Sequence, residues 1–94
     1  MSVTINKANL NRIIAPDMKE AAEAALRQGE ALELYTGANA GGQTVQVLVV
    51  AEDRAGLWMG GTTAWGEWDE EKRGVRLENE QGMLLNLNGE PVEE

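Results

Sequence analysis

The chain is predicted to fold as an α+β domain, with one or two N-terminal helices packed on an antiparallel β-meander of about five strands. Apolar residues recur at helical spacing in the first 29 residues, whereas short apolar or alternating runs separated by turn residues follow from residue 30 onward. No repeat or linker divides the 94 residues. We therefore expect one domain over 1–94, mainly helical over 1–29, a β-sheet over 30–90 and a flexible tail over 91–94.

The clearest local signal predicts a helix that begins at Asp17 and ends before Gly29. Asp17 precedes Glu20 by three residues, which is an Asp version of the capping box, and Gly29 stands where a left-handed C-cap is expected. The side chains at helical spacing on the predicted buried face are Met18, Ala21, Ala22, Ala25 and Leu26. Because most of them are small, this helix is expected to lie close against the sheet.

The segment before this helix predicts two shorter elements. Residues 3–5 are typical of a short strand, and Asn6 is a suitable cap for a brief helix with Leu10, Ile13 and Ile14 on one face. Pro16 disfavours helical geometry at the residue before it, which separates this helix from the main one.

After Gly29 the pattern is that of strands. Residues 31–36 and 44–51 are predicted strands, as are 57–59 and 62–68, which a bulge or close backbone approach at Gly60-Gly61 is expected to separate. Residues 75–78 and 83–87 are predicted to form a hairpin around 79–82. Together these segments give the meander of about five strands.

Composition excludes most chemistry. The chain has no histidine and no cysteine, and its one serine, Ser2, is near the N-terminus, so a proton shuttle of the usual kind, a thiolate metal site and a nucleophilic triad are all missing. Gly37 to Thr44 has the glycine spacing of a phosphate-binding loop, but Gln43 replaces the lysine that would reach the phosphates. We expect no catalytic residues, no metal ligands and no cofactor, and therefore no enzyme.

The charge distribution predicts the sign of a partner. The net charge is −8, and residues 30–94 carry thirteen acidic and four basic side chains. Such a field repels nucleic acid and anionic membranes and favours encounter with a basic protein, although acidity can also serve solubility alone. The first residues, MSVTINKANLNRI, are too polar for a signal peptide, and no apolar run approaches membrane-spanning length. We therefore expect a cytoplasmic protein.

The three tryptophans and the densest acidic cluster all lie within residues 58–71. Trp58, between Leu57 and Met59, is predicted to be core. On a regular strand Trp65 and Trp68 point to opposite faces, so at most one of them belongs to a given surface. Core packing is the alternative for each of them, but tryptophan often dominates interface energy. The predicted partner-binding residues are Trp65, Glu67, Trp68, Asp69, Glu70 and Glu71.

Three functions remain open. The first is a non-catalytic binding protein that masks the basic surface of a partner, such as a nucleic-acid-binding complex. In size, charge and lack of catalytic residues the chain is similar to small phage-encoded inhibitors of host defence nucleases (anti-CRISPR-like, acting as nucleic-acid or DNA mimics) and to toxin-neutralising immunity proteins. The second is a self-associating structural or accessory protein that forms a homo-oligomer through a sheet edge or a Trp face. The third, a small-molecule receptor with Trp rings and Gly60-Gly61 at its pocket, has little further support.

Overall fold

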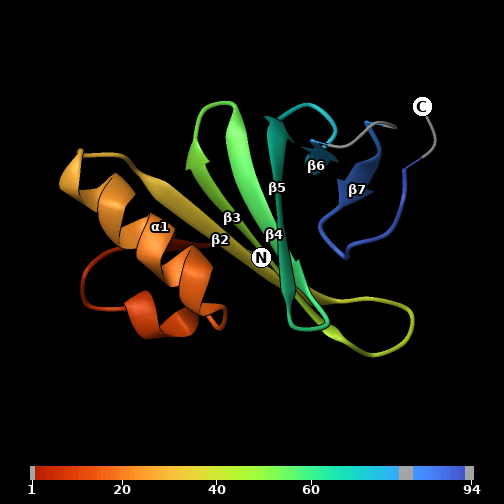
Figure 1. Ribbon diagram of the computed structural model, residues 1–94, viewed down its shortest axis with the longest axis horizontal. Helices are drawn as coiled ribbons and strands as arrows, with labels where there is room; N and C mark the ends of the chain where they lie inside the picture. Colours follow the sequence, from red (N-terminus) through yellow and green to blue (C-terminus); the bar gives the residue numbers. More distant parts are fainter. Residues whose placement is uncertain (1, 79–81, 93–94) are drawn as a thin grey trace.

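The computed structural model describes residues 2–78 and 82–92, and in them it shows an α+β fold with one α-helix and a seven-stranded antiparallel sheet. The strands follow one another across the sheet in chain order, from β1 at one edge to β7 at the other (Figure 1). The strands are β1 Ser2–Ile5, β2 Leu32–Ala38, β3 Thr44–Ala51, β4 Arg54–Met59, β5 Thr62–Asp69, β6 Gly74–Leu77 and β7 Leu84–Asn86.

The prediction of about five strands was therefore too low, for two reasons. Gly60 and Gly61 do not form a bulge within one strand. They have φ of 63° and 84° and join β4 to β5 between the paired residues Met59 and Thr62. Two consecutive residues with positive φ are typical of a type I′ hairpin turn, which favours glycine at both positions. The second reason is β1, which belongs to the sheet. It pairs with β2, although the helical segment lies between these two strands in the sequence.

The α-helix, α1, covers Pro16–Arg27, and its start differs from the predicted one. Ala15 is the N-cap and makes no side-chain capping bond, so the capping box of Asp17 and Glu20 is absent. Pro16 instead occupies the first turn, where its fixed φ suits the helix and its missing N–H costs no hydrogen bond. The predicted end is confirmed, because Gly29 has φ of 81° and Glu30 N donates to Ala25 O, as in a Schellman motif.

The second predicted helix is only one turn of 3₁₀-helix, Leu10–Arg12. Asn6 does not cap it, because Asn9 is the N-cap residue and Asn6 instead accepts a hydrogen bond from Ala8 N. Ile13 is buried but Ile14 is half exposed, so the two do not share a buried face.

The buried glutamine Gln46 of β3 fixes this N-terminal segment to the sheet. Its Oε1 accepts a hydrogen bond from Ile14 N at 2.8 Å, and its Nε2 donates to Arg12 O at 2.8 Å. Gln46 is only 2% exposed, so these bonds satisfy polar groups that water does not reach.

Side chains on the two faces of the sheet form two separate cores. Successive residues of a strand point to opposite faces, so β3 contributes Leu48 to one core and Val47 to the other. Met18 and Ala22 of α1 are buried in the core on the first face, with Ile5, Ile13, Ala15, Leu32, Leu34 and Leu48. The core on the second face consists of Tyr35, Val45, Val47, Ala55, Leu57, Trp68, Val75 and Leu85.

The second core is covered by the last part of the chain. Gly89 lies so close to β3 and β4 that a Cβ there would be 2.9 Å from Sδ of Met59 and 3.3 Å from Val45. Pro91 of the predicted tail forms a β-bridge with Leu85, and Val92 N donates to Leu84 O. Residues 93 and 94, and 79–81 of the predicted hairpin, lie outside the described residues.

Candidate functional site

Carboxylates from three separate segments gather at one end of the sheet. Glu30 follows α1, Glu52 is in the β3–β4 turn and Glu70 is in the β5–β6 loop, and all three line one pocket of about 380 Å³. These connections lie at the same end because hairpins of a meander alternate between its two ends (Figure 1, top). We call the segments 30–33, 52–53 and 69–71 the acidic end; it holds Glu30, Glu33, Glu52, Asp53, Asp69, Glu70 and Glu71.

Trp68 forms the apolar wall of this pocket and belongs to the core. It is 7% exposed, and its ring stacks on Tyr35 with centroids 5.7 Å apart. The indole Nε1 donates a hydrogen bond of 2.6 Å to Oε2 of Glu70. Arg73 Nη2 in turn donates to the hydroxyl of Tyr35 at 2.6 Å. Trp68 therefore holds the β5–β6 loop in place and offers little surface of its own.

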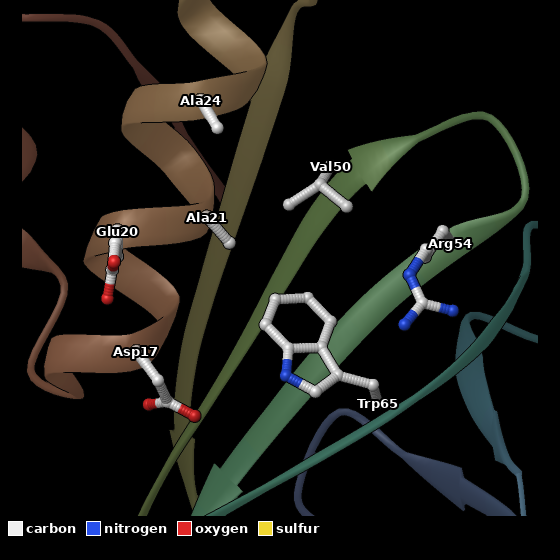
Figure 2. A pocket seen from close by; sticks show the side chains of 7 residues that line it. All are labelled: Asp17, Glu20, Ala21, Ala24, Val50, Arg54 and Trp65. Atoms are coloured by element: carbon white, nitrogen blue, oxygen red, sulfur yellow. The ribbon is translucent and has the colours of Figure 1, made fainter.

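Trp65 lies on the opposite face of the sheet, as strand alternation predicts. Trp65 packs against the first core, whereas Trp68 belongs to the second core. The half-buried Trp65 ring lines a groove of about 430 Å³ between α1 and the sheet (Figure 2). The other residues that line this groove, which we call the α1–β5 groove, are Asp17, Glu20, Ala21, Ala24, Val50 and Arg54.

Arg54 is the one basic side chain among the residues that line the α1–β5 groove. Its guanidinium carbon lies 5.6 Å from the centroid of the Trp65 ring, a cation–π distance. The same guanidinium forms an ion pair with Glu78, and both side chains are about half exposed. Such a pair contributes little to stability, so it positions Arg54 more than it stabilises the fold.

The remaining predicted contact residues are distributed over both regions. Glu67 is exposed on the Trp65 side of β5, opposite Arg54 in the register. Asp69 accepts a hydrogen bond from Lys72 N at 2.9 Å, which shapes the β5–β6 loop. Glu71 is exposed in that loop. The structure thus brings Trp68, Asp69, Glu70 and Glu71 together at the acidic end and places Trp65 and Glu67 outside it, on the face of β5 opposite the Trp68 ring.

The sequence-based selection missed Glu30 and Glu52 at the acidic end, and Asp17, Glu20 and Arg54 in the groove. Local sequence gave no signal for the groove residues, since they meet through packing of a helix on distant strands. The acidic end had a usable signal, because the alternation of turns in a meander places residues 30, 52 and 70 at the same end.

Within residues 2–78 and 82–92, no three Asp or Glu side chains are placed to hold a metal ion together. No helix in the same ranges combines the length and apolarity needed to cross a membrane. Comparison of the chain with protein-family models, with curated proteins and with solved structures gives no match. The arrangement of charged and aromatic side chains is therefore the basis for a functional proposal.

Proposed function

We propose that this protein is a small, non-catalytic binding protein that masks a basic surface of a protein partner in the cytoplasm. The observation that carries the proposal is the convergence of Glu30, Glu52 and Glu70 from three chain segments on one pocket. Folding thus concentrates negative charges that are far apart in the sequence. Solubility alone would need only negative charges dispersed over the surface.

The rest of the charge distribution supports the same proposal. The net charge of −8 produces a field that speeds encounter with a basic surface and discourages acidic partners. Of the two basic side chains in the β5–β6 loop, Arg73 is directed to Tyr35, with its guanidinium carbon 5.2 Å from the ring centroid. This basic group is therefore turned toward the core of the second face, which leaves the loop's contact surface mainly acidic.

The partner class we propose is a nucleic-acid-binding protein or complex. Duplex DNA carries a negative charge about every 1.7 Å along its axis, so proteins that bind it present basic grooves. Carboxylates that come from three chain segments to line one pocket, with Glu70 held by Trp68 Nε1, are suited to such a groove. The chain would then act as a nucleic-acid mimic, in the manner of phage-encoded inhibitors of host defence nucleases, or as an immunity-type protein.

The test is an affinity pull-down from lysate of the native host at low and high salt, with partners identified by mass spectrometry. We expect a partner with a basic surface, bound much more weakly at high salt, and lost with the double variant Glu70→Lys/Glu71→Lys. The control is Glu23→Lys/Glu90→Lys, which changes the net charge equally with both substitutions outside the acidic end. Binding that is insensitive to salt, or equal loss with both double variants, would count against the proposal.

The alternative is self-association, and the free edge of the sheet favours it. β1 pairs on one side with β2 and is an edge strand of the sheet. Edge strands offer backbone groups to a second chain. Light scattering should then show a mass that rises with concentration and falls with Trp65→Ala if the Trp face takes part. A strict monomer at high concentration removes this alternative.

A further inference from the structure

The α1–β5 groove combines three kinds of surface that a single long basic side chain would need. Its floor is apolar, with Ala21 and Ala24 from α1 and Val50 from β3 (Figure 2). The Trp65 ring provides an aromatic surface, and the carboxylate of Glu20 lies on the helix side. At about 430 Å³ the groove is within the size range of small-ligand sites, which is about 300–1,000 Å³.

Packing fixes the position of the aromatic surface. Gly56 lies directly beneath the Trp65 ring, since a Cβ on Gly56 would be 2.8 Å from Cζ3 of Trp65 and 2.9 Å from Cε3. The ring therefore rests against the backbone of β4 and has little freedom to collapse further onto the sheet. A ring held in this way is ready to stack without losing side-chain freedom on binding.

Arg54 shows that the Trp65 ring accepts a guanidinium group. Its guanidinium carbon already lies 5.6 Å from the ring centroid, with Glu78 neutralising the charge. Arg54 comes from the β4 end of the groove, whereas Glu20 and Asp17 lie on α1 across from it (Figure 2). The groove thus has a neutralised cation on one side and carboxylates on the other.

The two carboxylates on α1 differ in availability. Asp17 Oδ1 accepts a hydrogen bond from Thr63 Oγ1 at 3.0 Å. The Glu20 side chain is exposed and forms no hydrogen bond or ion pair within the part of the chain that the structure describes. Glu20 is therefore the carboxylate that can receive an incoming cation without breaking an existing contact.

We propose that the α1–β5 groove binds one arginine side chain of the basic protein partner. The aliphatic stem would lie on Ala21, Ala24 and Val50, as long basic side chains commonly cover apolar surface. The guanidinium would stack on Trp65 and pair with Glu20. Arginine suits this site better than lysine because its planar group can stack and bond in a fork at once. This inference rests on the proposed function and names where one partner residue is recognised.

The test is a titration of the full-length ¹⁵N-labelled protein with a hexa-arginine peptide at low salt, followed by NMR. The three indole Nε1–H signals are assigned with Trp→Phe variants. We expect the Trp65 indole and the amides of Ala21 and Ala24 to shift and saturate together. Glu20→Gln should weaken binding about three- to tenfold, and Trp65→Leu by a similar factor.

The matched control is Glu23→Gln. It removes the same charge from the same helix, but Glu23 lines a different pocket, with Lys7 and Leu10. Two results would refute arginine binding in the groove and leave the proposed function standing. One is peptide binding with chemical-shift changes confined to the acidic end, and the other is equal weakening of binding by Glu20→Gln and Glu23→Gln. No binding of the peptide at low salt would remove both. If hexalysine binds with the same affinity as hexa-arginine and the Trp65 indole signal does not shift, arginine binding in the groove is also refuted.

Discussion

Gly66 of β5 is the position where one added methyl group should cost the most. A Cβ there would overlap the carbonyl oxygen of Arg76 and lie 2.8 Å from its carbonyl carbon and 3.0 Å from Cα of Leu77. Carbon atoms pack at about 3.5–4.0 Å, so β5 and β6 would have to separate by about 0.7 Å or more. The obstacle is backbone on a paired strand, so no side-chain rotation relieves it.

The expected cost of Gly66→Ala follows from this overlap. Overpacking of this kind costs about 1–3 kcal/mol, and each ladder hydrogen bond weakened by the separation adds about 0.5–1.5 kcal/mol. We expect a loss of about 3 kcal/mol in the free energy of unfolding, which for a domain of this size lowers Tm by about 12–24 °C. Urea unfolding followed by tryptophan fluorescence and by circular dichroism measures it.

Gly41→Ala is the control for this prediction. Gly41 is exposed in the β2–β3 turn, and a Cβ there would meet only Oδ1 of Asn39, at 3.4 Å. Its stability should stay within about 0.5 kcal/mol of the parent protein. A Gly66→Ala variant as stable as the parent, or a Gly41→Ala variant equally destabilised, would refute the reasoning from strand proximity.

Two further predictions concern the groove and the N-terminal segment. Gly56→Ala should lift the Trp65 ring off β4, shift tryptophan emission to the red and weaken hexa-arginine binding about threefold; an unchanged emission spectrum would contradict the assigned contact. Gln46→Met should leave the part-buried Ile14 N–H and Arg12 C=O without their partner and cost about 2–6 kcal/mol, because each of the two unpaired groups costs about 1–3 kcal/mol. Hydrogen exchange at Ile14 should accelerate, whereas Gln28→Met, at the exposed end of α1, should leave it unchanged.

Local patterns in the sequence predicted the elements that depend on neighbouring residues. The helical spacing around Met18 and the glycine at position 29 predicted α1 and its end, and β alternation predicted that Trp65 and Trp68 lie on opposite faces. The helix start was wrong because Asp17 and Pro16 compete for the first turn. Proline fits the first turn of a helix without loss of a hydrogen bond, because the N–H that it lacks has no partner there. A search for capping side chains does not include this effect.

The parts that could not be predicted depend on how distant segments pack. Trp58 was expected to be core, but it is only partly buried against the first core, while Trp68 is the most buried of the three tryptophans. That difference arises because Trp68 packs in the second core with Val75 of β6 and Leu85 of β7, on the face where Gly89 lies against β3 and β4. The α1–β5 groove was hidden for the same reason, since Glu20 and Trp65 are 45 positions apart in the sequence.

The acidic end and the α1–β5 groove meet at the end of β3, and this predicts separate kinetic roles for them. Val50 lines the groove and Ala51 lines the acidic pocket, so consecutive residues face the two regions. A partner that binds at this end of the sheet can contact both the acidic end and the groove. Charges at an interface rim mainly set the association rate, whereas a desolvated anchor mainly sets the dissociation rate. Against a partner recovered by pull-down, Glu70→Lys/Glu71→Lys should therefore slow association, and Trp65→Leu should speed dissociation about three- to tenfold. Changes in association rate alone for both variants would show that Trp65 is not an anchor.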